Sequence, residues 1–297
     1  MISLNGGARE SKEQAPWGYP TARPFLRWAG GKQKLIKWLL PFLPPVAAYS
    51  RYYEPFFGAG ALFFALRPID ATIADINGEL MNCYTQVAKC PALVALLLQG
   101  YSIKDCREFF YEVRAREPSK MSDEERAARF VYLNKAAFNG IYRVNKSGEF
   151  NVPYGPSFKG PAIPSPQVLA SAARCLRGTQ MVAGDFEQVV ATACDGSFVY
   201  LDPPYPPLSR TSYFTHYSAD RFCWKEQLRV AHVFSELSER GCLVMLTNAE
   251  VDDVISLYRE FHISSIDAIR WLGSNGDRFH VREIVVTNYE PKETIRA

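Results

Sequence analysis

The sequence predicts an α/β protein in which a doubly wound, largely parallel sheet carries a mainly helical insertion between its second and third strands. Short apolar segments typical of strands alternate with amphipathic helical segments toward both ends of the chain, and this alternation indicates a parallel sheet covered on both faces. From Gly78 to about Cys175, helical patterns dominate instead. The chain has 297 residues, 47% of them hydrophobic, which suits one large domain or one domain carrying a smaller one.

Two helices and two strands are predicted before the insertion. An amphipathic helix is expected over Lys32 to Leu43, where a proline pair stops it. A strand from Arg51 to Pro55 leads into a glycine loop, and a helix follows over Ala61 to Leu66. A second strand, Ala71 to Asp75, ends on a carboxylate. Residues 1 to about 20 are rich in glycine, proline and polar residues, so poor order is expected there.

The insertion and the second half of the sheet follow. The helices expected in the insertion are Glu79 to Lys89, Ala92 to Gln99, Cys106 to Ala115 and Glu124 to Ala137. Asn139 to Tyr154 is expected to form a hairpin, because β-favouring residues flank a glycine-containing centre. The later strands are expected over Met181 to Gly184, Phe198 to Leu201, Cys242 to Thr247, Ile263 to Ile269 and Arg282 to Asn288, with helices at Lys225 to Arg240 and near Asp252 to Glu260.

No helical segment separates the last two strands, so they should pair antiparallel at one edge of the sheet. The sequence thus predicts one domain made of residues 1–77 and 176–297, and an inserted domain of residues 78–175.

Basic residues are concentrated in two segments, although the formal net charge is only +3. Between Arg126 and Lys159 there are six basic residues and one acidic residue, Glu149. From Gln14 to Tyr53 there are six basic residues and no acidic one. Such patches favour a polyanionic partner, although a solvated face beside an acidic neighbour would have the same composition.

Several classes of protein are disfavoured. No apolar run approaches the roughly 20 residues of a membrane span, and the N-terminus lacks the order of a secretory signal. The seven cysteines include no C-x-x-C pair, so neither a zinc ribbon nor a disulfide framework is expected, and a reducing cytoplasm fits better.

Two glycine-containing motifs lie where a ligand of a doubly wound sheet is expected, beyond the carboxyl ends of the strands. In the segment Glu54 to Gly60, glycines allow the backbone to approach a ligand closely, and Asp75, 17 residues after Gly58, can accept hydrogen bonds from both hydroxyls of a ribose. The segment Trp28 to Lys32 places a cation and bare backbone before a helix, which suits a carboxylate. An ordinary tight turn and a simple helix cap with a solvated lysine remain the alternatives.

The segment Asp202-Pro203-Pro204-Tyr205 indicates a particular chemistry. Its two prolines stop the preceding strand and stiffen the turn. An aniline-like amine such as adenine N6 is a poor nucleophile, because its lone pair is delocalised into the ring. Asp202 and the Pro203 carbonyl can accept both of its N–H bonds and stabilise the positive charge that develops during attack. Tyr205 can stack on the base, which must leave the duplex to reach such a pocket. The alternative is a purely structural turn.

The motifs, in this order along the chain, resemble those of the Dam-type (alpha-class, D12) DNA adenine-N6 methyltransferases. The resemblance runs from about Phe25 to Tyr289. It rests on the residues at 28–32, 54–60 and 74–77, on Asn139-Gly140, Arg143, 148–153 and 184–186, on the Asp-Pro-Pro-Tyr segment 202–205, and on 274–276.

The resemblance implies a Rossmann-like, S-adenosylmethionine-dependent methyltransferase sheet with an inserted DNA-recognition domain. It implies direct in-line methyl transfer, in which positioning supplies much of the rate, without a metal or a covalent enzyme intermediate. Asp185 and Phe186 would meet the adenine of the cofactor. The implied cofactor pocket consists of Trp28, Gly30, Lys32, Phe56, Gly58, Asp75, Asp185, Phe186 and Asp202, and the implied catalytic residues are Asp202, Pro203, Pro204 and Tyr205.

The resemblance also implies that the insertion reads double-stranded DNA. Arg143 is similar to the arginine that reads a guanine by a bidentate contact. Phe138 is expected to wedge into the gap left by the flipped base, unless it is a core residue of the insertion. Asn139 and Lys146 are expected to hold phosphates, although a solvated Lys146 is the alternative. Residues 156 and 157 are Pro and Ser, where the best-known members have a basic and an aromatic residue. The outer base contacts are therefore expected to differ, and the expected target is GATC or a related site.

Other amines are the main alternative substrates. Asp rather than Ser at position 202 argues against cytosine N4, and Asp rather than Asn argues against a protein glutamine, while RNA adenine stays open. The complete motifs oppose a non-catalytic DNA-binding regulator. The sequence therefore predicts a cytoplasmic, nucleoid-associated enzyme that serves a restriction–modification system, a phage or chromosomal regulation. Its cofactor would be S-adenosylmethionine and its partner double-stranded DNA, with no membrane association and no obligate protein partner.

Overall fold

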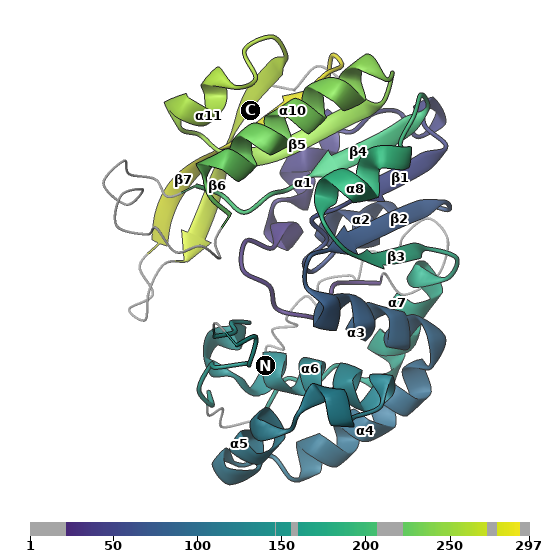
Figure 1. Ribbon diagram of the computed structural model, residues 1–297, viewed down its shortest axis with the longest axis vertical. Helices are drawn as coiled ribbons and strands as arrows, with labels where there is room; N and C mark the ends of the chain where they lie inside the picture. Colours follow the sequence, from purple (N-terminus) through teal and green to yellow (C-terminus); the bar gives the residue numbers. More distant parts are fainter. Residues whose placement is uncertain (1–21, 146, 156–159, 207–221, 272–277, 292–297) are drawn as a thin grey trace, which may run out of the picture.

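A seven-stranded sheet forms the centre of the protein (Figure 1). The computed structural model describes residues 22–145, 147–155, 160–206, 222–271 and 278–291, so the expectations for residues 1–20 and for Lys146 lie outside the described residues. The strand order is β3-β2-β1-β4-β5-β7-β6. The strands are β1 (Arg51–Glu54), β2 (Ala71–Asp75), β3 (Gln180–Ala183), β4 (Ser197–Leu201), β5 (Leu243–Ala249), β6 (His262–Trp271) and β7 (Arg278–Thr287).

The strand directions follow the expected pattern. Strands β1 to β5 pair parallel, whereas β7 pairs antiparallel with both β5 and β6. The antiparallel edge predicted from the missing helix is therefore confirmed. Strand β1 lies between β2 and β4, so the order of the strands reverses beside it. In open α/β sheets, ligands bind at such a reversal, beyond the carboxyl ends of the strands.

Both faces of the sheet are covered by helices, as a parallel sheet requires (Figure 1). On one face, Tyr53 and Val199 share a core with Phe234; on the other, Tyr52 and Phe198 share a core with Phe63. The helices around the sheet are α1 (Ile36–Leu39), α2 (Ala61–Leu66), α8 (Phe186–Val189), α10 (Trp224–Glu239) and α11 (Asp252–Ser256).

Five helices stand between β2 and β3, where the helical insertion is predicted. They are α3 (Gly78–Lys89), α4 (Pro91–Ile103), α5 (Arg107–Ala115), α6 (Asp123–Ala136) and α7 (Pro166–Leu176). Four of them match the predicted helices, although α4 extends beyond Gln99. The sequence analysis missed α7, which Ser165 caps and which packs on α3 and α4.

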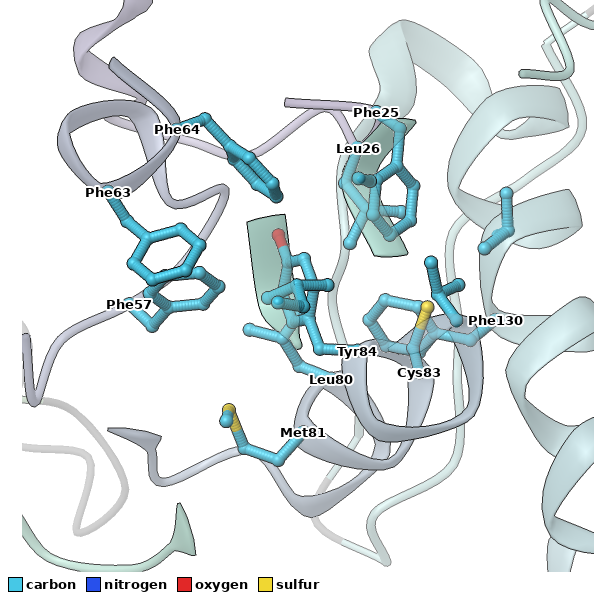
Figure 2. Close-up of a cluster of buried hydrophobic side chains, with 14 of the residues drawn as sticks. Phe25, Leu26, Phe57, Phe63, Phe64, Leu80, Met81, Cys83, Tyr84 and Phe130 are labelled. Atoms are coloured by element: carbon cyan, nitrogen blue, oxygen red, sulfur yellow. The ribbon is translucent and has the colours of Figure 1, made fainter. Parts of the chain in front are cut away.

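The insertion and the sheet share one continuous core. Tyr84 of α3 packs edge-on against Phe57 at the end of β1, with ring centroids 4.7 Å apart, and lies beside Phe64 of α2 (Figure 2). Phe130 of α6 belongs to the same cluster (Figure 2). Because this core runs from the sheet into α6, the insertion is held rigidly against the carboxyl ends of β1 and β2.

Two expected elements differ in the structure. Lys32 to Leu43 is not one helix but two short 3-10 turns, Lys32–Lys34 and Leu40–Phe42, on either side of α1. Pro41 has no N–H to continue an α-helical ladder. The hairpin predicted over Asn139 to Tyr154 is reduced to the single bridges Val144↔Phe150 and Ala137↔Tyr154.

A tight turn over Phe138–Gly140 replaces the start of that hairpin, because Asn139 and Gly140 both have positive φ and interrupt an extended strand. Further 3-10 turns are Val46–Ala48, Pro118–Lys120 and Val190–Thr192. Among the described helices, none combines the length and apolar character needed to cross a membrane.

Candidate active site

A cavity of about 810 Å³ opens at the carboxyl ends of β1 to β4. Its volume falls in the range of roughly 300–1,000 Å³ typical of small-molecule sites. The nine residues predicted to hold a cofactor and the four predicted for catalysis all line this cavity; they are Trp28, Gly30, Lys32, Phe56, Gly58, Asp75, Asp185, Phe186, Asp202, Pro203, Pro204 and Tyr205, with Asp202 in both sets. Motifs far apart in the sequence thus meet in one place.

The glycine loop after β1 is held by the carboxylate at the end of β2. Asp75 accepts hydrogen bonds from the backbone N–H of Gly58 at 3.0 Å and of Asn77 at 2.9 Å. Gly58 has a φ of +48°, and a Cβ there would lie 2.7 Å from Cδ1 of Trp28. Burial raises the pKa of Asp75. Asp75 therefore shapes the loop as well as facing the cavity, a support role that the sequence spacing did not reveal.

Trp28 connects the cavity to the helical insertion. Its indole stacks on Tyr142, with ring centroids 5.5 Å apart, and on Phe130 of α6 at 6.2 Å. Tyr142 lies one residue before Arg143 in the segment predicted to read DNA. The segment that contains Tyr142 is therefore in direct contact with Trp28, which lines the cavity.

Lys32 contacts the carboxylate of Asp202 directly. The Lys32 side chain is 4% exposed, and its Nζ lies 2.6 Å from Oδ1 and 2.8 Å from Oδ2 of Asp202. The same ammonium lies 4.6 Å from the ring centroid of Tyr205, a cation–π distance. The sequence analysis assigned Lys32 to a ligand carboxylate and did not foresee that its partner within the chain is Asp202.

Asp202 is fixed from the sheet side as well. The Thr247 hydroxyl on β5 donates to Oδ1 of Asp202 at 2.7 Å and lies 3.0 Å from the Tyr200 hydroxyl. Thr247 is fully buried. The carboxylate thus has a set orientation at the mouth of the cavity.

Glu54 is a buried acid in the cavity wall to which the sequence analysis assigned no role, although it begins the quoted glycine motif. It is 2% exposed, and the Tyr52 hydroxyl donates to its Oε2 at 2.8 Å. Burial raises the pKa of Glu54 to about 8, so the carboxyl group is mostly protonated at neutral pH.

This raised pKa makes stability depend on pH. The folded chain binds a proton at Glu54 that the unfolded chain, with an ordinary pKa of 4.5, releases. Stability is therefore greatest below that value and falls as the pH rises toward 8. Glu54→Gln should make stability less dependent on pH. At pH 8 its free energy of unfolding should be higher than that of the wild type by on the order of 2–5 kcal/mol. Urea unfolding at pH 5 and pH 8 measures the free energy of unfolding of both proteins. An equal change in that free energy between the two pH values for Glu54→Gln and the wild type would contradict the prediction.

The opposite end of the cavity is aromatic. Phe56 and Phe186 have ring centroids 5.0 Å apart, and Phe222 closes the group 5.8 Å from Phe56. Arg229 of α10 donates to Oδ1 of Asp185 at 2.8 Å, and its guanidinium lies 4.8 Å from the ring centroid of Phe186.

Of the residues predicted to contact DNA, the three that the structure describes lie outside this cavity; they are Phe138, Asn139 and Arg143. Phe138 and Asn139 line a second hollow of about 360 Å³ together with Arg27 and Lys135. Phe138 is 45% exposed, which excludes the alternative that it is a core residue. Arg143 is exposed and donates to Oδ1 of Asn151 at 2.8 Å. Burial, with a smaller effect of Arg27, lowers the pKa of Lys135 to about 8.

Sheet order, glycine loop and strand-end motif together are consistent with a methyltransferase fold. The family model described as "D12 class N6 adenine-specific DNA methyltransferase" matches residues 28–272, and the chain belongs to this family. It is therefore an enzyme that methylates adenine N6 in DNA.

Curated relatives carry matching names. The chain is 40% identical over 274 residues to the Type II methyltransferase M1.LlaDCHI of Lactococcus lactis subsp. cremoris, covering 90% of this chain and 95% of the relative. It is 37% identical to the Type II methyltransferase M.MjaIII of Methanocaldococcus jannaschii, covering 90% and 99%. It is also 30% identical to the DNA adenine methylase of Escherichia coli K12, covering 91% and 96%.

Proposed function

We propose that the cavity binds S-adenosylmethionine and that Asp202 and the Pro203 carbonyl hold the N6 amine of an extruded adenine for methylation. The observation that carries this proposal is that the Asp-Pro-Pro-Tyr motif and the glycine loop open into the same cavity. A methyl group bound to a sulfonium is already activated, so the chain has to orient the two reactants.

The charge of the cavity supports a cationic ligand. Besides the mostly protonated Glu54, four carboxylic residues line it, against Lys32 as the single Lys or Arg among the described lining residues; the four are Asp75, Asp185, Asp202 and Glu226. S-adenosylmethionine carries a sulfonium and an ammonium beside one carboxylate. We place that carboxylate near Lys32, the ribose at Asp75, and the adenine against the Phe56 and Phe186 pair with its amine on Asp185.

Asp185 can fill this role without giving up its internal contacts. The backbone N–H of Glu187 and the guanidinium of Arg229 both donate to Oδ1 of Asp185. Within the described part of the chain these contacts leave Oδ2 to accept from an amine. The aromatic pair Phe56 and Phe186 offers apolar surface to a purine ring.

The catalytic residues act by accepting hydrogen bonds. Both amine hydrogens point at acceptors when Asp202 and the Pro203 carbonyl hold the base, which favours a pyramidal nitrogen and stabilises its developing positive charge. Tyr205 supplies a stacking surface for the extruded base. Because Lys32 contacts Asp202 directly, we expect the bound cofactor carboxylate to draw the ammonium away before the amine docks.

Recognition of the DNA is assigned to the insertion. We propose that Arg143 reads a guanine, that Phe138 fills the gap left by the extruded base, and that Asn139 and Lys146 hold phosphates. The exposure of Phe138 and the basic hollow beside it support this placement. The target is GATC or a related site, and the enzyme would work at the nucleoid, in the cytoplasm.

Methyl transfer from labelled cofactor to duplex DNA, RNA and protein tests the proposal. Label should appear in duplex DNA alone. Labelling of RNA or protein, or cofactor binding without transfer to any DNA, would count against it.

Arg143→Ala should relax sequence preference more than it weakens nonspecific binding, because a bidentate guanine contact is worth about 1–3 kcal/mol of discrimination. Methylation of a randomised duplex library measures the preference, and filter binding at fixed salt measures the affinity. Arg114→Ala is a matched control, because Arg114 donates to the Val152 carbonyl in the insertion and is assigned no base contact. An unchanged preference for Arg143→Ala would refute the assignment.

A further inference from the structure

Three buried polar side chains hold the Asp-Pro-Pro-Tyr motif from the side of the sheet. They come from three different elements, and each contacts a different member of the motif: Thr247 of β5, Gln227 of α10 and Glu283 of β7. None of the three is more than 1% exposed. Buried polar groups are costly unless they are hydrogen-bonded, so their convergence on one turn fixes that turn.

Gln227 fixes the peptide that follows the motif's second proline. Its Nε2 donates to the Pro204 carbonyl at 2.8 Å, while its Oε1 accepts from Nδ2 of Asn248 at 2.9 Å. Oδ1 of Asn248 in turn accepts from the backbone N–H of Ala249. This chain of contacts sets the direction of the Gln227 amide. With the Pro204 carbonyl engaged, the Pro203 carbonyl is the one that the contacts among the described residues leave to accept from a base amine.

Glu283 anchors the tip of Tyr205. The Tyr205 hydroxyl donates to Oε2 of Glu283 at 2.8 Å. Glu283 is paired with Ala249 in the β5–β7 ladder, so the hydroxyl is tied to the rigid part of the sheet. The Tyr205 ring itself stays partly exposed at the cavity and has the Lys32 ammonium 4.6 Å from its centroid.

This hydrogen bond is not needed for packing alone. An apolar pair of similar shape can replace a buried hydrogen-bonded pair at nearly no cost in stability. A carboxyl group aimed at one hydroxyl instead restricts rotation and tilt of the ring. Burial raises the pKa of Tyr205, which keeps the hydroxyl protonated as the donor.

We propose that Glu283 and Gln227 are positioning residues for methyl transfer: Glu283 sets the plane of the Tyr205 ring on which the extruded base stacks, and Gln227 orients the Pro203–Pro204 turn so that the Pro203 carbonyl faces the amine. Neither residue touches the reacting atoms. The inference rests on the proposed placement of the target base, and it extends the catalytic machinery to β7, about 80 residues beyond the motif.

The test compares Glu283→Leu, which removes the acceptor, with Glu283→Gln, which keeps one. Duplexes carry the wild-type recognition site with either adenine or 2-aminopurine at the target position. For Glu283→Leu, kcat should fall about 10- to 100-fold, the loss expected from a misplaced reactant, while KM for the cofactor stays the same. The fluorescence of 2-aminopurine should rise, because the base stacks less on a mobile ring. Glu283→Gln should restore most of kcat and the lower fluorescence.

Gln227→Met should lower kcat to a similar degree without raising the fluorescence, because the ring remains anchored. Thr287→Val is the matched control: Thr287 is a buried polar residue on the same strand whose hydroxyl donates to the Tyr289 carbonyl, away from the motif. It should lower the thermal midpoint while leaving kcat at the wild-type value.

Wild-type kcat and fluorescence for Glu283→Leu would overturn the proposal, as would an equal loss of kcat in Thr287→Val. Should Glu283→Leu fail to fold, Tyr205→Phe decides, because it keeps the ring and removes the donor. Lower kcat with higher fluorescence then supports the proposal, and wild-type values overturn it. A wild type that transfers no methyl group to DNA would instead refute the proposed function itself.

Discussion

Asp202→Ala is expected to abolish methyl transfer while the fold survives. The substitution removes the proposed anionic acceptor of the amine, and losing one preorganised electrostatic partner of a transition state costs about 100- to 1,000-fold in rate. We expect the upper end of that range or beyond, because Asp202 is also the internal partner of Lys32 at 2.6 Å. Single-turnover transfer of labelled methyl groups to duplex DNA measures the effect.

The control separates chemistry from folding. Asp70→Ala removes an exposed carboxylate that pairs with Arg51 on the surface, and it should retain wild-type turnover. Circular dichroism at 25 °C should show that both variants are folded, although Asp202→Ala should unfold at a lower temperature because it leaves the buried Lys32 ammonium without its carboxylate partner. Turnover of Asp202→Ala above about a tenth of the wild-type rate would refute the role assigned to Asp202.

Lys32→Met is expected to have the second-largest effect, on cofactor binding. The Lys32 ammonium is 4% exposed and lies among the cavity's carboxylates. Truncating one partner of a buried, hydrogen-bonded charge pair, here the proposed pair of Lys32 with the ligand carboxylate, costs about 2–5 kcal/mol of binding free energy. We therefore expect affinity for S-adenosylhomocysteine, which keeps the same carboxylate, to fall about 100-fold. Calorimetric titration measures the change.

Lys37→Met serves as its control, because Lys37 is an exposed lysine of the same segment that lies over the Trp38 ring. It should bind S-adenosylhomocysteine as tightly as the wild type. If Lys32→Met also bound as tightly as the wild type, Lys32 would have no part in holding the ligand carboxylate. Its contact with Asp202 would then be purely structural.

Strand ends carried most of what the sequence predicted about the site. Asp75 is the last residue of β2 and Asp202 directly follows β4, and these two strands are the parallel neighbours of β1, so topology alone brings both carboxylates to one edge of the sheet. The place of the cavity was therefore predictable, because the alternation of strands and helices and the residues that stop each strand are visible in the sequence. The antiparallel pairing of β6 and β7 was predictable too, because the sequence shows no helical segment between these two strands.

Contacts between distant side chains were not predictable in this way. Glu283 follows Arg282 at the start of the predicted strand and reads as one of two adjacent charged residues, and only the pairing of β7 with β5 shows that it faces Tyr205. Arg229 lies on an amphipathic helix with many charges, so nothing distinguishes it until α10 packs beside Asp185. Partners of this kind depend on register and packing, which periodicity does not encode.

Local backbone chemistry explains the remaining differences. Pro41 breaks the segment predicted as one long helix, and the left-handed residues Asn139 and Gly140 replace the start of the expected hairpin with a turn. Both differences arise from one or two residues, a proline without an N–H and a pair with positive φ. The pattern of the surrounding residues does not reveal such local breaks.

Mass spectrometry of nucleosides tests the central claim most directly. Purified protein is incubated with S-adenosylmethionine and unmethylated genomic DNA, and the DNA is then digested to nucleosides. The wild type should yield N6-methyldeoxyadenosine and Asp202→Ala none, because the account requires the Asp202 carboxylate beside the Pro203 carbonyl. N4-methyldeoxycytidine as the product, or no methylated nucleoside from DNA of varied sequence, would contradict the account.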